Sequence, residues 1–112
     1  MTASVRTSKG LTIVDVAGHI DLACSPALRK TMLESLKTAD RVAVNLAEVG
    51  YIDSSGIASL LEVLKEARNG HKGFALFGLT DAVREVLQLT RLMGVFEIHE
   101  TEEEAVNAGT AK

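Results

Sequence analysis

The sequence has little of what marks several classes of protein. A single cysteine among 112 residues excludes an internal disulfide framework and suits a reducing compartment. Three phenylalanines, one tyrosine and a net charge of −3 argue against nucleic-acid binding, which needs clustered cations and stacking surfaces. No apolar run is long enough to span a bilayer, and the N-terminus lacks the pattern of a secretory signal. We therefore expect a cytoplasmic protein with no nucleic-acid partner and no direct membrane contact.

What remains is the composition of one globular domain, with 46% hydrophobic and 24% charged residues. Strand-like and helix-like segments alternate along the chain, which predicts an α/β fold with a mixed, mostly parallel sheet of four to five strands and about four helices. The expected strands cover 5–8, 11–17, 42–46, 74–77 and 95–98. The expected helices run from 25 to about 38, from the segment 53–56 to 69, from 80 to about 91, and onward from 101.

Local signals set several of these boundaries. Ser25 is placed to cap the first helix, with Pro26 in its first turn, where a missing N–H costs nothing. Thr80 is placed to cap the third helix. Gly18 ends the second expected strand, and Gly70 suits the left-handed position that often follows a helix.

The segment Asp53-Ser54-Ser55-Gly56 stands where the second helix begins. A helix N-terminus presents free N–H groups and favours negative charge. A phosphate on Ser54 would add about −1.5 to −2 charges beside Asp53, and a partner packed there would meet a bulkier, more negative surface. The alternative interpretation is that Ser54 or Ser55 caps the helix and Gly56 eases a tight turn.

The residues around this segment resemble the signature of the STAS family, which includes bacterial anti-sigma factor antagonists. The resemblance is carried by the run from Val49 to Leu61, and it extends to three further segments. These are Gly18-His19-Ile20-Asp21, the strand Val42–Leu46, and Leu79–Leu87 with Val95-Phe96. The match spans about residues 4–106, which we take as the domain, leaving 107–112 as a frayed tail.

This resemblance implies a switch by phosphorylation. In the family, the first serine after the aspartate accepts the phosphate, and that position is Ser54. The unphosphorylated form binds an anti-sigma factor that is also an ATP-dependent serine kinase, and a PP2C-type phosphatase reverses the modification. No cofactor is expected, since the ATP belongs to the kinase. Gly56-Ile57-Ala58 departs from the Gly-Leu-Gly common in sporulation members, so the helix face offered to a partner can differ. The expected partner-binding residues are Asp53, Ser54, Ser55, Gly56, His19 and Asp21.

Other functions stay open at this point. Similar single domains serve as subunits that dock on the ATPase of phospholipid-transporting ABC systems, and others switch targets unrelated to sigma factors. A serine hydrolase is disfavoured, because the Gly-x-Ser-x-Gly elbow is absent and no motif links a histidine to Ser54. The isolated histidines and Cys24 have no metal-ligand spacing, so no metal is expected. The sequence leaves both a monomer and a weak dimer possible.

Overall fold

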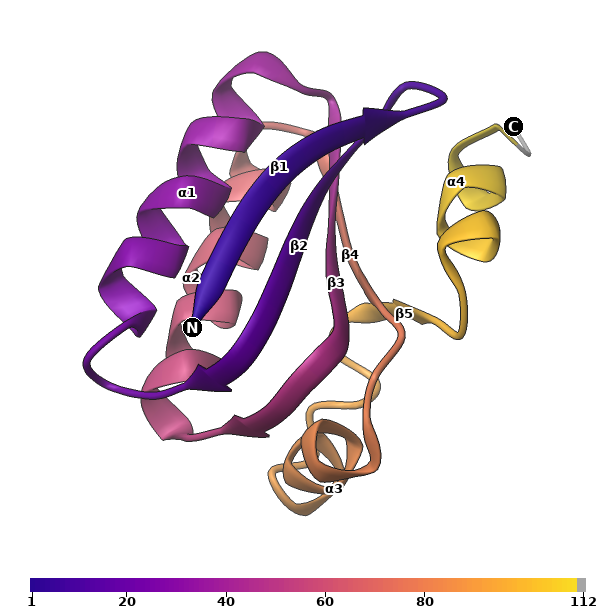
Figure 1. The fold of residues 1–112 in the computed structure, drawn as a ribbon. Helices are drawn as coiled ribbons and strands as arrows, with labels where there is room; N and C mark the ends of the chain where they lie inside the picture. The colour runs from indigo at the N-terminus through magenta and orange to yellow at the C-terminus, as the bar shows by residue number, and fades with distance from the viewer. Residues whose placement is uncertain (111–112) are drawn as a thin grey trace.

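Five strands form one sheet in the order β1-β2-β3-β4-β5 in the computed structural model, which describes residues 1–110 and the side chains through residue 108 (Figure 1). The strands are β1 (Thr2–Ser8), β2 (Leu11–Ile20), β3 (Arg41–Ile52), β4 (Gly73–Phe77) and β5 (Glu97–His99). The helices are α1 (Ser25–Thr38), α2 (Ser54–Asn69), α3 (Asp81–Leu89) and α4 (Glu102–Thr110).

The sheet is mixed and mostly parallel, as predicted. β1 and β2 form an antiparallel hairpin, whereas β2, β3, β4 and β5 pair in parallel. Parallel neighbours require a crossover connection, and the helices supply it. The carboxyl ends of β2 and β3 therefore meet at one edge of the sheet, where His19 pairs with Tyr51 and Ile20 with Ile52.

Two hydrophobic clusters lie on opposite faces of the sheet. The larger one is built around α1 and α2, whose buried residues include Leu28, Met32 and Leu60. Each such side chain contributes about 1.5–3 kcal/mol by leaving water. The smaller cluster lies under α4, which covers the other face (Figure 1). Its members are Leu11, Ile13, Ala43, Ala75, Phe77, Ala105 and Val106.

The strands β2 and β3 are longer than the sequence predicted. β2 continues past Gly18 to Ile20, and β3 continues past Leu46 to Ile52. Gly18 has φ +97° and lies at an irregularity in the β2–β3 register, so it bends the strand without ending it. The local stop signal was overridden by pairing between the two strand ends.

The predicted cap of α1 was wrong. The N-cap is Cys24, whose side chain makes no capping bond, and Ser25 is already helical and buried. The turn before the helix is held by Asp21 instead, whose Oδ1 accepts from the N–H groups of Ala23 and Cys24 at 3.1 and 3.3 Å. A short aspartate side chain often organises such a turn by bonding to the backbone just ahead of it.

The end of α2 also differs from expectation. Gly70 has φ −90°, and the left-handed residue is His71, with φ 56°. Gly70 N donates to Glu66 O and His71 N donates to Arg68 O. Gly70 therefore still belongs to the last hydrogen-bonded turn of α2, and the left-handed conformation comes one residue later. The glycine signal marked the correct region but the wrong residue.

The C-terminal third follows the sequence more closely. Thr80 caps α3 as predicted, accepting from Val83 N at 3.3 Å, and its hydroxyl donates to Val49 O of β3 at 2.7 Å. The last strand is displaced from 95–98 to Glu97–His99. α4 includes 107–110 of the predicted tail, and residues 111 and 112 lie outside the described part. Within the described residues, no helix has the length and apolar character needed to cross a membrane.

Candidate regulatory phosphorylation site

The segment Asp53–Gly56 lies where β3 passes into α2, at the carboxyl edge of the sheet. Asp53 N donates to Ile20 O at 3.1 Å, which ties the start of the helix to the end of β2. Asp53 is therefore held by its backbone N–H, which bonds to β2, and by its carbonyl, which accepts from Ile57 N in the first turn of α2.

Asp53 is the N-cap of α2. Its Oδ1 accepts from the backbone N–H groups of Ser55 and Gly56 at 3.0 and 3.1 Å, which satisfies donors that a helix start leaves free. The Ser55 hydroxyl, together with the backbone N–H groups of Gly56, Ser55 and Leu22, holds the pKa of the Asp53 carboxyl below its usual range. The alternative in which Ser54 or Ser55 caps the helix is therefore not the one observed.

The two serines have different surroundings. The Ser55 hydroxyl is half-buried and donates to Asp53 Oδ1 at 2.5 Å. Ser54 is exposed, and within residues 1–110 its hydroxyl has no hydrogen-bond partner. The Ser54 hydroxyl is thus free, whereas the Ser55 hydroxyl is already hydrogen-bonded to Asp53.

Gly56 is buried and has a packing reason to be glycine. A Cβ built at this position would lie 2.7 Å from Ile20 Cγ2 and 2.7 Å from Ile52 Cγ1, closer than real carbon atoms approach. The first turn of α2 therefore packs directly on the ends of β2 and β3. This close approach sets the height at which Ser54 stands above the sheet edge.

His19 and Asp21 come from the end of β2 and the loop after it. The His19 ring packs edge-on against Tyr51, with ring centroids 5.7 Å apart, and both residues are exposed. Asp21 uses its carboxylate in the turn before α1. The structure therefore brings His19 beside the residues that precede Asp53, while the Asp21 side chain serves the loop.

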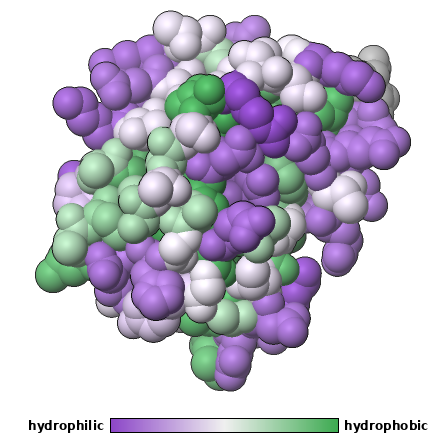
Figure 2. All heavy atoms as spheres, viewed as in Figure 1, coloured by the Kyte–Doolittle hydropathy of each residue, from purple (hydrophilic) through white to green (hydrophobic). Residues whose placement is uncertain are grey.

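Two exposed apolar residues at this edge were missed by sequence reasoning. Leu22 is 73% exposed, and Tyr51 is 48% exposed. The backbone N–H of Leu22 bonds to the Asp53 carboxylate, and Tyr51 lies two residues before Asp53. Figure 2 shows a hydrophobic patch over the β2–α1 loop at the lower left, whereas hydrophilic residues dominate the side of α4. One signal in the sequence could have found them, since Leu22 directly follows Asp21 and Tyr51 lies two residues before Asp53.

We name this surface the switch face, defined by His19, Leu22, Tyr51, Asp53 and Ser54. It combines the exposed side chains of Leu22 and Tyr51 with the free hydroxyl of Ser54 and the ionised carboxylate of Asp53. Partner-binding surfaces are commonly enriched in exposed large side chains of this kind.

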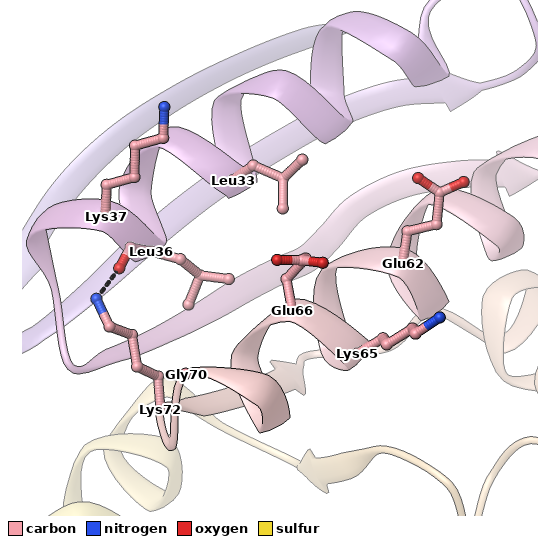
Figure 3. Close-up of a pocket in the computed structure, with 8 residues that line it drawn as sticks. All are labelled: Leu33, Leu36, Lys37, Glu62, Lys65, Glu66, Gly70 and Lys72. Carbon is pink, nitrogen blue, oxygen red and sulfur yellow. Dashed lines mark hydrogen bonds between the residues drawn. The ribbon is translucent and has the colours of Figure 1, made fainter.

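A groove lies elsewhere, between the C-terminal halves of α1 and α2 (Figure 3). It has a volume of about 720 Å³ and mixed charge, and the Lys72 amine donates to the Leu36 carbonyl at one end. It shares no residue with the switch face. Its lining residues are Leu33, Leu36, Lys37, Glu62, Lys65, Glu66, Gly70 and Lys72. In the described part of the chain, no group of three potential metal ligands comes together.

Comparison with known proteins places the chain in a family. The model of the STAS domain matches residues 2–105. An anti-sigma-B factor antagonist of Listeria monocytogenes is 30% identical over 90 residues, which cover 80% of this chain and 79% of that protein. The crystal structure of an anti-sigma factor antagonist from Mycobacterium paratuberculosis aligns with a TM-score of 0.80 at 25% identity, covering 96% of this chain and 92% of the other.

A third relative shows the fold alone. The anti-sigma factor antagonist SpoIIAA, in its unphosphorylated form, aligns with a TM-score of 0.81 at 18% identity over 99% of this chain and 98% of the other. Fold and sequence likeness together define the class of this α/β domain. The chain belongs to the STAS domain family, and the relatives that it resembles include anti-sigma factor antagonists.

Proposed function

We propose that this protein is an anti-sigma factor antagonist switched by phosphorylation of Ser54. In its unphosphorylated form it binds an anti-sigma factor that is also an ATP-dependent serine kinase, and so frees the sigma factor in the cytoplasm. The observation that carries the proposal is the free, exposed hydroxyl of Ser54 beside an Asp53–Ser55 pair whose own groups are engaged.

The charges at the helix start explain how phosphorylation would release the partner. A phosphate at a helix N-terminus is ordinarily stabilised by free backbone N–H groups. Here the N–H groups of Ser55 and Gly56 already donate to Asp53, which is ionised. A phosphate on Ser54 would therefore add to an existing negative charge and would project outward.

The partner would meet this charge within an otherwise apolar contact. Leu22 and Tyr51 flank Asp53 and are exposed in the free protein. Burying them favours binding, whereas burying an unpaired phosphate beside them costs several kcal/mol. The switch then needs no change of fold, because the added charge alone removes the affinity.

The surroundings of Ser54 favour the role of substrate over that of nucleophile. An activated serine needs a base within hydrogen-bond reach. Among the described residues, no histidine bonds to Ser54, and the exposed ring of His19 packs on Tyr51. We therefore assign the phosphoryl-transfer chemistry to the kinase, its reversal to a PP2C-type phosphatase, and no cofactor to this chain.

Affinity capture from native lysate tests the proposal. The baits are wild type, Ser54→Ala and Ser54→Asp, and bound proteins are identified by mass spectrometry. Capture of an ATP-binding serine kinase by wild type and Ser54→Ala, with loss by Ser54→Asp, supports the proposal. Capture of a transporter ATPase by all three baits would refute it, and a phospho-sensitive partner without a sigma pathway would assign the same switch to another target.

A further inference from the structure

The two edges of the sheet are built differently. The β5 edge is three residues long and has α4 next to it in the chain. The β1 edge is seven residues long, and every residue from Thr2 to Ser8 pairs with β2 in an unbroken register. Among the described residues no strand lies on its other side. Because backbone groups of a strand point alternately to its two sides, β1 presents a row of unpaired donors and acceptors.

β1 has few of the features that normally protect such an edge. Exposed edge strands are usually short, bulged, charged, or interrupted by proline. β1 is seven residues long, pairs in an unbroken register and contains neither lysine nor proline. Its one charged residue, Arg6, is held by Asp15 at 2.6 Å and by Glu102 at 2.5 Å. The strand is therefore suited to pairing with a further strand.

We propose that a second copy of this chain pairs with β1 in antiparallel orientation, so that one sheet continues across a two-fold dimer. An antiparallel seam between identical strands uses the same edge on both copies and is thus self-complementary. The opposite edge, β5, is too short to continue the sheet, so assembly closes at two copies. This inference is independent of the proposed function.

The side chains of β1 select a register. Val5 lies opposite Val14 on the side of α1 and α2, whereas Ser4 and Arg6 lie opposite Asp15 and Ile13 on the other side. Centring the seam on Val5 places the two Val5 side chains, each 51% exposed in the free chain, against each other. It also sets Arg6 opposite Ser4, whereas centring on Arg6 would oppose two like charges.

This dimer leaves the switch face open. The N-terminal end of β1 lies beside the carboxyl end of β2, since Thr2 pairs with Ala17. An antiparallel seam therefore places the two Ser54 residues at opposite ends of the shared sheet. Each copy can then meet its own partner.

Sedimentation velocity over a wide micromolar range tests the inference, with wild type, Val5→Lys and Val5→Glu. We expect a reversible wild-type dimer and a weakening of roughly tenfold or more in each variant, because like charges then face each other at the centre of the seam. An equimolar mixture of the two variants should restore the dimer, which separates a broken seam from a misfolded chain.

The matched control is Leu89→Lys, which places the same charge on an exposed apolar residue of α3. It should dimerise like wild type. A wild type that stays monomeric throughout the range would overturn the inference. So would a dimer that Val5→Lys leaves intact, or variants whose mixture stays monomeric although each is folded by circular dichroism.

Discussion

Ser55 Oγ donates to Asp53 Oδ1 at 2.5 Å, across the first turn of α2. The same carboxylate oxygen accepts from the backbone N–H groups of Ser55 and Gly56. Ser55 is thus tied into the helix cap, and the neighbouring Ser54 is left exposed with a free hydroxyl. Two adjacent serines that look equivalent in sequence differ in what a kinase can reach.

The first prediction concerns which serine is modified. With the kinase recovered by capture, Ser54→Ala should lose phosphorylation, and Ser55→Ala should keep it, because the Ser55 hydroxyl is engaged and half-buried. Phosphopeptide mass spectrometry after reaction with ATP measures both. Incorporation at Ser55 in the Ser54→Ala variant would contradict the assignment.

The second prediction concerns the apolar part of the switch face. Leu22→Ala and Tyr51→Ala should each weaken partner binding by roughly tenfold or more, as expected when a large interface side chain is truncated. Both side chains are exposed, so thermal unfolding should be little changed. Leu89→Ala, a similarly exposed residue on α3, is the control and should bind normally. Equal affinities for all three variants would place the interface elsewhere.

The third prediction contrasts two glycines. Gly56→Ala should lower the free energy of unfolding by about 1–3 kcal/mol, because its Cβ would overlap Ile20 and Ile52 in a packed core. Gly70→Ala should be neutral or stabilising by up to about 1 kcal/mol, since its φ is ordinary and its Cβ would meet no atom closer than 3.5 Å. Urea denaturation of both variants decides the matter, and a larger loss at Gly70 would refute this packing argument.

The fourth prediction concerns pH. Arg6 bonds to Asp15 and Glu102 and lowers the pKa of both carboxyl groups. Arg6→Ala should lower the free energy of unfolding by about 1 kcal/mol at neutral pH, a modest figure because the groups are partly exposed.

The stabilisation by the Arg6 ion pairs should also change with pH in a definite direction. Because the folded pKa values lie below the unfolded ones, the stabilisation is complete above about pH 4–5 and is lost as pH falls through the folded values. The difference between wild type and Arg6→Ala should therefore shrink in acid. Denaturation curves at neutral and acidic pH measure it, and a difference that grew in acid would contradict the assigned ion pairs.

Local signals predicted the presence of each helix, and at α3 they also predicted the capping residue, whereas at α1 the predicted cap was wrong. Thr80 caps α3 as its position before a helical pattern indicated, and the segment Asp53–Gly56 begins α2. Which of three consecutive capping residues forms the N-cap was not predictable, because it depends on where β3 ends. That point is set by the pairing of Ile20 with Ile52, a contact between residues far apart in the sequence.

Parts of the switch face could not be predicted from the sequence either, because they also depend on pairing between distant strands. Gly18 carries a local stop signal, yet β2 continues because its end pairs with β3. That continuation brings His19 onto Tyr51 and sets Leu22 beside Asp53. The role of Ser54 itself stays a prediction, drawn from resemblance and supported by its exposure.

The most direct test of the switch is the affinity of the captured kinase for this protein before and after phosphorylation of Ser54. Calorimetric titration with the purified unphosphorylated and phosphorylated forms measures it. We predict a loss of about a hundredfold or more, because an unpaired phosphate would have to be buried beside Asp53. Equal affinities for the two forms would show that phosphorylation of Ser54 does not control binding.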